Sequence, residues 1–272
     1  MPELPEVETT RRGLLPHVVG HTIQQIVVRN PKLRWPVPEN LPQLTQLQTI
    51  QALSRRGKYL LVQLDHGTIL IHLGMSGSLR ILDSATPAGV HDHIDIVLQN
   101  QQCIRLRDPR RFGAVLWAEN NPLNHALLVN LGVEPLTDDF NGDYLYMKSR
   151  GRSSSIKSFI MDSHHVVGVG NIYANESLFH AGIHPELAAG KISRPRYVRL
   201  VESIKNTLEK AITAGGSTLR DFVGSDGASG YFQQQYFVYG RTDLTCHQCG
   251  QLIRHLRQNQ RSTFYCAQCQ KK

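Results

Sequence analysis

The chain has 272 residues, a mean hydropathy of −0.29 and a formal net charge of +8, from 30 lysines and arginines against 22 acidic residues. At ~150 residues per domain, this length suggests one large domain or, in preference, two, and a chain of this size can bury a sizeable core without disulfide bonds. No apolar run approaches the ~18 residues of a membrane helix, and no secretory signal is visible, which argues against membrane-spanning and secreted proteins. The positive charge favours a polyanionic partner, because lysine and arginine displace the cations condensed on nucleic acid.

The first half of the chain has the pattern of one helix followed by short strands. Early prolines and acids followed by arginines predict a helix from Pro2 to about Leu15. Between His21 and Glu119, short alternating runs are separated by turn signals such as Asp65-His66-Gly67, which predicts a sandwich or barrel. The expected strands are Thr22–Arg29, Tyr59–Leu64, Thr68–Leu73, Ile94–Leu98, Cys103–Arg107 and Ala114–Ala118.

The second half of the chain changes to helical spacing after Glu134-Pro135, and it ends in a cysteine-rich segment. Glycines at 182 and 215–216 stand where helices are expected to end. The predicted fold class is therefore α+β, with domains at 1–134, 135–235 and 236–272. The expected helices are Ile156–Met161, Asn171–Ala181 and Arg196–Ala214.

Two CxxC pairs close to the end of the chain predict a zinc ribbon. Sixteen residues separate the pairs, and this is the spacing at which two thiolates from each side surround one tetrahedral ion. Because four cysteines complete the coordination, the zinc is expected to be structural. The predicted ligands are Cys246, Cys249, Cys266 and Cys269, whereas Cys103 is expected to be a buried apolar residue.

The arginines of this ribbon and the start of the chain are the other chemically distinctive features. Arg254, Arg257 and Arg261 lie in or beside the expected hairpin, where they suit phosphate contacts or simply an exposed basic surface.

Removal of Met1 would leave Pro2 with a free amine of pKa ~7.7–8.0, so that a part of it is neutral at pH 7 and can attack a sugar carbon to form an iminium. Glu3 beside it suits a general acid, although Pro-Glu is also ordinary helix-opening sequence.

Several segments, taken together, resemble bacterial formamidopyrimidine-DNA glycosylase, also called 8-oxoguanine DNA glycosylase. They occur in the family's order and extend over essentially the whole chain, which makes the resemblance specific. The segments are PELPEVETTRRGL at 2–14, HLGMSGSLR at 72–80, DPRRFG at 108–113, VGVGNIYANESLFHAGIHP at 167–185 and the cysteine segments GRTDLTCHQCG and QRSTFYCAQCQ.

The resemblance implies a fold and a set of roles. It implies an N-terminal catalytic β-sandwich, a helical domain with a helix–two-turn–helix motif and a zinc hairpin. In the matching positions, Pro2 is the nucleophile at C1′, Glu3 is the proton donor, and Lys58 assists in proton transfer. The positions expected to hold phosphates are Lys58, His72, Asn171 and Arg261. The positions expected to fill the space of an extruded base are Met75, Arg110 and Phe112, with Arg110 facing the orphaned cytosine.

Taken by residue type alone, several of these positions have simpler interpretations. Met75 suits a turn, Phe112 a core, and His72 a structural histidine at a strand end. Arg110 belongs to an Arg-Arg pair that suits a solvated surface.

The segment Ser217–Gln235 fits the family's mobile loop, with Thr218, Arg220 and Tyr239 as candidate contacts to the base.

The resemblance implies a base-excision repair enzyme, a bifunctional DNA glycosylase and abasic-site lyase. Such an enzyme removes 8-oxoguanine and formamidopyrimidines from duplex DNA through a proline Schiff base and cleaves the strand by β,δ-elimination. Two alternatives stay open: an endonuclease VIII-like glycosylase for oxidised pyrimidines, and a non-catalytic zinc-ribbon DNA-binding protein. The expected setting is a monomer in the bacterial cytoplasm, associated with the nucleoid through DNA, with no membrane partner and one structural Zn²⁺.

Overall fold

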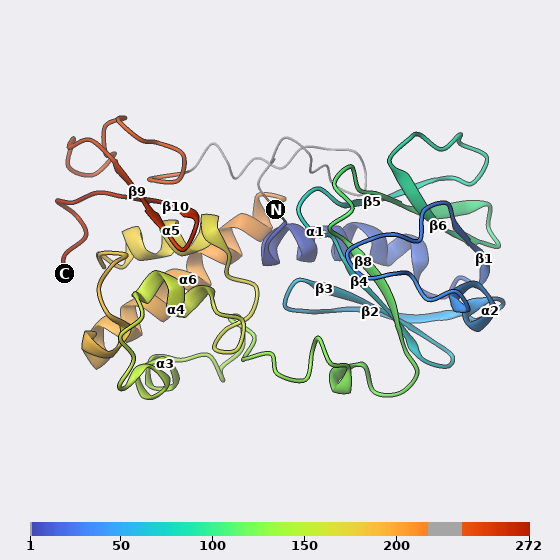
Figure 1. Ribbon diagram of the computed structural model, residues 1–272, viewed down its shortest axis with the longest axis horizontal. Helices are drawn as coiled ribbons and strands as arrows, with labels where there is room; N and C mark the ends of the chain where they lie inside the picture. The colour runs from blue at the N-terminus through green and yellow to red at the C-terminus, as the bar shows by residue number, and fades with distance from the viewer. Residues whose placement is uncertain (1, 217–235) are drawn as a thin grey trace. The chain divides into compact units, whose positions relative to one another are not determined.

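The computed structural model describes residues 2–216 and 236–272, and these form two compact units (Figure 1). Unit 1 takes its described residues from Met1–Val129 and Ala214–Tyr231, and unit 2 from Asn130–Thr213 and Phe232–Lys272. The chain therefore returns to unit 1 just after its longest helix. The predicted division at 1–134, 135–235 and 236–272 stays a prediction.

Unit 1 contains two four-stranded antiparallel sheets. One has the strand order β1-β6-β7-β5 and the other β2-β3-β4-β8, so each sheet mixes strands from both ends of the unit. The first sheet consists of β1 (Ile23–Val28), β6 (Asp92–Leu98), β7 (Gln102–Arg107) and β5 (Ser78–Asp83). The second consists of β2 (Ile50–Arg56), β3 (Tyr59–Leu64), β4 (Thr68–His72) and β8 (Ala114–Ala118).

A single apolar cluster joins the two sheets and the helices of unit 1. Ile96 and Ile104 enter it from the first sheet, and Val62 and Ile71 from the second, while α1 (Leu4–Val18) adds Val7, Leu14 and Val18. Sheets that share one core face to face form a sandwich, so the predicted β-sandwich is confirmed. The short helix α2 (Leu41–Thr45) packs beside β1, and η1 (Pro122–Asn124) follows β8.

Unit 2 is helical and is built around its longest helix. The amphipathic helix α6 (Arg194–Thr213) buries Tyr197, Leu200, Ile204 and Leu208, and it packs against α3 and α5. The remaining helices are α3 (Gly142–Ser149), α4 (Ile156–Met161), α5 (Asn171–His180) and the short η2 (Ala189–Lys191). No helix among the described residues is long and apolar enough to cross a membrane.

The zinc-ribbon segment packs on α5 within unit 2 (Figure 1). Its hairpin pairs β9 (Arg254–Gln258) with β10 (Arg261–Tyr265), and Asn259 and Gln260 between them both have positive φ, as a tight two-residue hairpin turn requires. A small apolar core of Phe179, Val238 and Ile253 with two of the cysteines lies beneath it.

The structure adds elements that the sequence pattern did not predict. Strands β2 and β5 and helices α2 and α3 were missed, because β2 ends in three polar residues, Ser54, Arg55 and Arg56, and α3 has only a weak apolar face. The first helix also runs past its expected end at Leu15. Although Pro16 lacks an N–H, the helix gains the complete burial of Val18 in the core by continuing one more turn.

Candidate functional site

The two residues expected to carry the chemistry lie buried at the start of α1. Pro2 precedes the helix, and Glu3, which is 2% exposed, forms its N-cap. The backbone N–H of Glu3 donates to Oε2 of Glu6 over 2.8 Å, which fixes the direction of the chain at Pro2. A Cβ added to Gly216 would lie 3.4 Å from the Glu6 side chain, so the chain passes this helix turn just before residue 217.

A second acid of α1 ties the helix to the turn that carries Lys58. Burial alone would raise the pKa of Glu8, but hydrogen bonds from two arginines and the charge of a third outweigh it and hold the pKa at about 2. Arg55 donates from Nε to Glu8 and from Nη1 to the carbonyl of Gly57, directly before Lys58. The three arginines bound to Glu8 are Arg11, Arg12 and Arg55.

His72 lies at the end of β4, opposite Tyr59 on β3. Its Nδ1 accepts the N–H of Gly74 over 3.0 Å, so a neutral ring carries its proton on Nε2 and donates from there. Burial and the nearby charges of Lys58 and Arg34 lower the pKa of His72 to about 4. His72 is thus a neutral hydrogen-bond donor beside two cations, which is a suitable arrangement for a phosphate oxygen.

Two loops of unit 1 are held together by the buried carboxylate of Asp108, which is 0% exposed. Its Oδ1 accepts the hydroxyl of Ser76 over 2.7 Å, and its Oδ2 accepts the N–H of Gly113 over 2.8 Å. Ser76 Oγ in turn accepts the N–H of Arg110. Asp108 therefore fixes the loop after β4 against the loop before β8.

These loops present the three residues expected to fill the space of an extruded base. A Cβ on Gly74 would lie 2.3 Å from the backbone of Phe112, so only glycine permits this approach, which its φ of +62° also favours. Met75 is 38% and Phe112 44% exposed, and the guanidinium of Arg110 lies 5.0 Å from the Phe112 ring centroid. Two large exposed apolar side chains and an arginine thus gather on one loop pair, and neither Met75 nor Phe112 is part of the core.

In unit 2, Asn171 is the first residue of α5. Gly170 is the N-cap, and Gly168 before it has a φ of +81°, so the loop turns sharply into the helix. The Asn171 carbonyl accepts the side-chain amide of Asn175, whereas its own Oδ1 is buried without a hydrogen-bond partner among the described residues. The N-terminal end of a helix, next to an amide side chain, suits an anion.

The four predicted zinc ligands converge in unit 2. Their sulfur atoms all lie within 4.8 Å of one another, with Sγ–Sγ distances of 3.9 Å for Cys246–Cys269 and 3.4 Å for Cys249–Cys266. Sulfurs bound to one zinc at ~2.3 Å lie ~3.8 Å apart in a tetrahedron, whereas disulfide sulfurs lie ~2.05 Å apart. The four thiols therefore fit a single structural Zn²⁺. Cys103, as expected, is a buried free cysteine of β7.

Buried polar groups fix this hairpin to the helices. Glu176 of α5 accepts the backbone N–H groups of residues 237–239. Burial raises the pKa of Glu176, although these three hydrogen bonds act to lower it. Asn175 accepts the N–H of Phe264. Lys157 of α4, 2% exposed, donates from Nζ to the Ser262 carbonyl and to Thr263 Oγ1 at 2.8 and 2.7 Å. Strand β10 is thus held by α4 and α5, and α5 also holds the segment at 237–239.

The hairpin presents its arginines to solvent. The side chains of Arg254, Arg257 and Arg261 are exposed and form no hydrogen bond or ion pair with any described residue. Arg261 follows the turn directly and neighbours Ser262, which Lys157 holds. A rigid support for an unpaired guanidinium is what binding of a phosphate requires.

The structure thus divides the predicted site residues between the units. Unit 1 holds Pro2, Glu3, Lys58, His72, Met75, Arg110 and Phe112, and unit 2 holds Asn171, Arg261 and the four cysteines. Within unit 1, Lys58 and His72 are near neighbours, as are Met75, Arg110 and Phe112. Of the candidate contacts to the base, Tyr239 packs its ring on Tyr236 and Phe264, whereas Thr218 and Arg220 lie outside the described residues.

Sequence reasoning missed the residues that hold these groups in place. Asp108, Asn175 and Glu176 lie inside the motifs given above and Lys157 lies in an expected helix, but no role was assigned to them. The only signal in the sequence was a polar residue within an apolar pattern. Such a signal does not identify a partner that is distant in the sequence, as Thr263 is for Lys157.

The fold and the cysteine site define a zinc-hairpin protein with a β-sandwich unit and a helical unit. Family models match all three parts: the formamidopyrimidine-DNA glycosylase N-terminal domain at 1–115, its H2TH domain at 131–223 and the zinc finger found in FPG and IleRS at 243–272. The match of the middle part confirms the predicted helix–two-turn–helix domain class. The match of the last part agrees with the four-sulfur site.

Relatives and solved structures agree with these matches. The formamidopyrimidine-DNA glycosylase of Stutzerimonas stutzeri is 56% identical over 271 residues, which is 100% of each chain. A crystal structure of a Lactococcus lactis FPG variant with Fapy-dG-containing DNA is similar at a TM-score of 0.93 and 34% identity, covering 100% of both chains. The Lactococcus lactis complex with abasic-site DNA gives 0.92 and 34%, covering 99% of this chain and 100% of that one. The chain belongs to the formamidopyrimidine-DNA glycosylase family.

Proposed function

We propose that this chain removes oxidised purines, 8-oxoguanine and formamidopyrimidines, from duplex DNA and then cleaves the strand at the abasic site. Family membership over the full length carries this proposal, since the solved relatives include complexes with Fapy-dG-containing and abasic-site DNA. The enzyme is a DNA glycosylase with lyase activity. Its partner is double-stranded DNA, and we propose that it acts as a monomer.

The chemistry is assigned to the start of α1. With Met1 removed, the Pro2 nitrogen attacks C1′, the bond from C1′ to the base nitrogen breaks, and the base leaves with a proton. Glu3, buried beside Pro2, supplies the proton that opens the sugar ring, and Lys58 assists in proton transfer. The resulting iminium makes the C2′ proton acidic, so the 3′-phosphate and then the 5′-phosphate leave by elimination.

Access to C1′ requires the nucleotide to leave the base stack, at a cost of a few kcal/mol. Met75 and Phe112, exposed on the loops that Asp108 joins, would occupy the vacated space, and Arg110 would donate to the orphaned cytosine. An arginine held 5.0 Å from an aromatic ring centroid is restrained in direction, which favours a specific contact.

Phosphates around the lesion would be held by both units. In unit 1 the candidates are Lys58 and the neutral Nε2–H donor of His72, and in unit 2 they are the helix start at Asn171 and the guanidinium of Arg261. The zinc supplies no step of the reaction in this proposal. Its cysteines hold the hairpin on which Arg261 stands.

Borohydride trapping tests this proposal directly. On a duplex with one 8-oxoguanine opposite cytosine, we expect a covalent adduct at Pro2, and no adduct with protein that retains Met1. An adduct only on oxidised pyrimidines would assign the chain the endonuclease VIII-like specificity. Tight binding without any adduct would instead support a non-catalytic protein.

We also propose a cytoplasmic location with association to the nucleoid. The support is the bacterial origin of the relatives and the DNA substrate proposed above. A fluorescent fusion should overlap with stained DNA in bacterial cells, and a signal that is excluded from the nucleoid would contradict this.

A further inference from the structure

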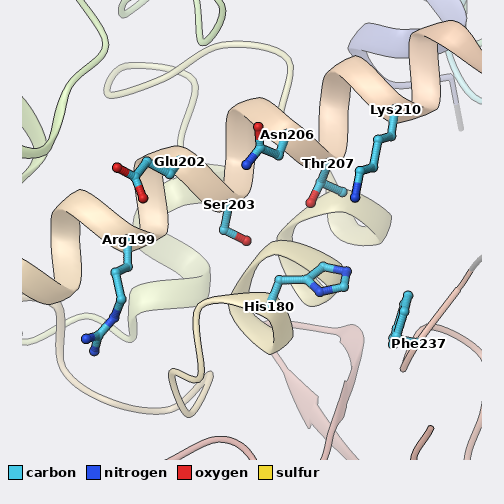
Figure 2. Close-up of a pocket in the computed structure, with 8 residues that line it drawn as sticks. All are labelled: His180, Arg199, Glu202, Ser203, Asn206, Thr207, Lys210 and Phe237. Atoms are coloured by element: carbon cyan, nitrogen blue, oxygen red, sulfur yellow. The ribbon is translucent and has the colours of Figure 1, made fainter. Parts of the chain in front are cut away.

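A groove along α6 in unit 2 contains none of the residues assigned to DNA binding or catalysis. Its volume is about 370 Å³, which is in the range of ligand sites. Figure 2 shows one face of α6 above the end of α5, with Phe237 at the side. The lining residues are His180, Arg199, Glu202, Ser203, Asn206, Thr207, Lys210 and Phe237.

The groove is elongated, with a cation at each end. Arg199 and Lys210 stand eleven residues apart on one face of α6, which corresponds to ~16 Å along a helix axis. Neither has an ion-pair partner among the described residues. Glu202 is the single acid of the lining, so the groove carries a net positive charge.

The floor of the groove is held rigidly and includes an aromatic surface. The Phe237 ring stacks on Phe179 at 5.5 Å and meets the His180 ring edge-on at 4.7 Å. Its backbone N–H is bound by Glu176. Partial burial and the charge of Lys210 lower the pKa of His180, so this imidazole is neutral at pH 7 and adds no third cation.

One hydroxyl in the lining has no hydrogen-bond partner among the described residues. Thr10 and Thr45 each donate to the carbonyl four residues earlier in their helices, and Ser203 donates to the Ser177 carbonyl. Thr207 is only 4% exposed but forms no such bond within the described part of the chain, and Figure 2 shows it on the edge of α6 that faces His180. The Thr207 oxygen is not among the fully enclosed unpaired atoms, so it is accessible at the groove and can bond to a ligand atom there.

We propose that this groove binds an extended acidic peptide of a partner protein. About five residues at ~3.3 Å each span the distance from Arg199 to Lys210, so carboxylates at both ends of such a peptide can reach the two cations. An apolar side chain in its middle packs on Phe237, and peptide groups bond to Asn206 and Thr207. A nucleic-acid strand fits less well, because it places a phosphate at every nucleotide and therefore also opposite Glu202 and Phe237, whereas the peptide carries its charges only at its two ends.

Fluorescence polarisation with short labelled peptides tests this inference at low salt. The probes are Asp-Asp-Phe-Asp-Asp, its glycine-centred counterpart, the lysine-flanked counterpart Lys-Lys-Phe-Lys-Lys, and a labelled single strand of five thymidines. We expect saturable binding of the first probe, binding about fivefold weaker for the glycine-centred peptide, and none for the lysine peptide.

Charge-reversal variants assign the binding to the groove. Lys210→Glu and Arg199→Glu should each weaken binding of the acidic phenylalanine peptide by about tenfold or more. The matched control Lys191→Glu, an exposed lysine of η2 outside the groove, should stay within about twofold. Thr207→Val should also weaken binding, while Lys210→Glu leaves nicking of lesion-containing duplex unchanged.

Three results would overturn the inference. One is the absence of saturable peptide binding at millimolar concentration. Another is peptide binding that Lys210→Glu and Lys191→Glu reduce equally. The third is tighter, Lys210-dependent binding of the thymidine strand, which would make the groove a nucleic-acid site. Because nicking is measured in the same variants, loss of the proposed repair activity would be recognised separately.

Discussion

The hydroxyl of Ser76 donates to Oδ1 of Asp108 over 2.7 Å, and this bond joins two loops whose residues are 32 positions apart in the sequence. The other carboxylate oxygen holds the N–H of Gly113. This carboxylate holds the loops of Met75 and Phe112 together, although it forms no hydrogen bond with either residue. Asp108 is therefore a positioning residue in the proposed extrusion of the base.

Asp108→Ala is expected to reduce excision of 8-oxoguanine more than cleavage at a preformed abasic site. The substitution leaves Ser76 and the Gly113 N–H without their acceptor, at a cost of about 3 kcal/mol in the free energy of unfolding. It also loosens the loops that carry Met75 and Phe112. Asp108→Asn, which keeps one acceptor, should recover most of the loss. Equal losses on both substrates would argue against a role in base extrusion.

Glu8→Gln should destabilise the protein at neutral pH but have little effect near pH 2. The pKa of Glu8 is about 2 in the folded chain against 4.5 for an unperturbed glutamate, so its contribution is complete above pH 4.5 and is lost as the pH falls to about 2. The difference corresponds to about 3 kcal/mol at pH 7. Urea unfolding from pH 2 to 7 measures it. The exposed Glu39→Gln is the control, and a similar pH profile for both variants would refute the assignment.

His72 is expected to stabilise the fold less as the pH falls from 6.5 to about 4. Its folded pKa of about 4 lies below the usual 6.5, so in this window the unfolded chain takes up a proton that the folded chain does not. The difference in unfolding free energy between wild type and His72→Gln should therefore shrink on acidification. A difference that stays constant from pH 7 to 4 would mean that the folded imidazole titrates normally.

Arg261→Ala should flatten the dependence of log binding constant on log salt concentration by about one unit for lesion-containing duplex. The exposed guanidinium has no protein partner among the described residues, so the change removes a phosphate contact without releasing a buried charge. Lys191→Ala, which removes an exposed charge elsewhere in unit 2, should leave the slope unchanged. An unaltered slope for Arg261→Ala would remove this residue from the phosphate contacts.

The sequence predicted local features better than the contacts between distant segments. Strand β8 and helix α4 have the predicted bounds, and the four cysteines converge as their spacing predicted, because each follows from a local pattern. The sheet orders β1-β6-β7-β5 and β2-β3-β4-β8 could not be derived, since alternation indicates which face is buried but not which strand is adjacent. The partners of Asp108 and Lys157 were missed for the same reason.

Removal of zinc is expected to weaken duplex binding strongly without altering the reactivity of the Pro2 amine. The four thiols surround the ion, and the hairpin beside them has only a small apolar core, so loss of the metal should unfold the segment that carries Arg261. Chelation should release one zinc per chain and lower duplex affinity by about a hundredfold, and added Zn²⁺ should restore it. Reductive amination of Pro2 by a small aldehyde should proceed unchanged. Cys103→Ala, at a buried cysteine outside the site, should retain one zinc. Full duplex affinity in the metal-free protein would refute the structural role of the ion.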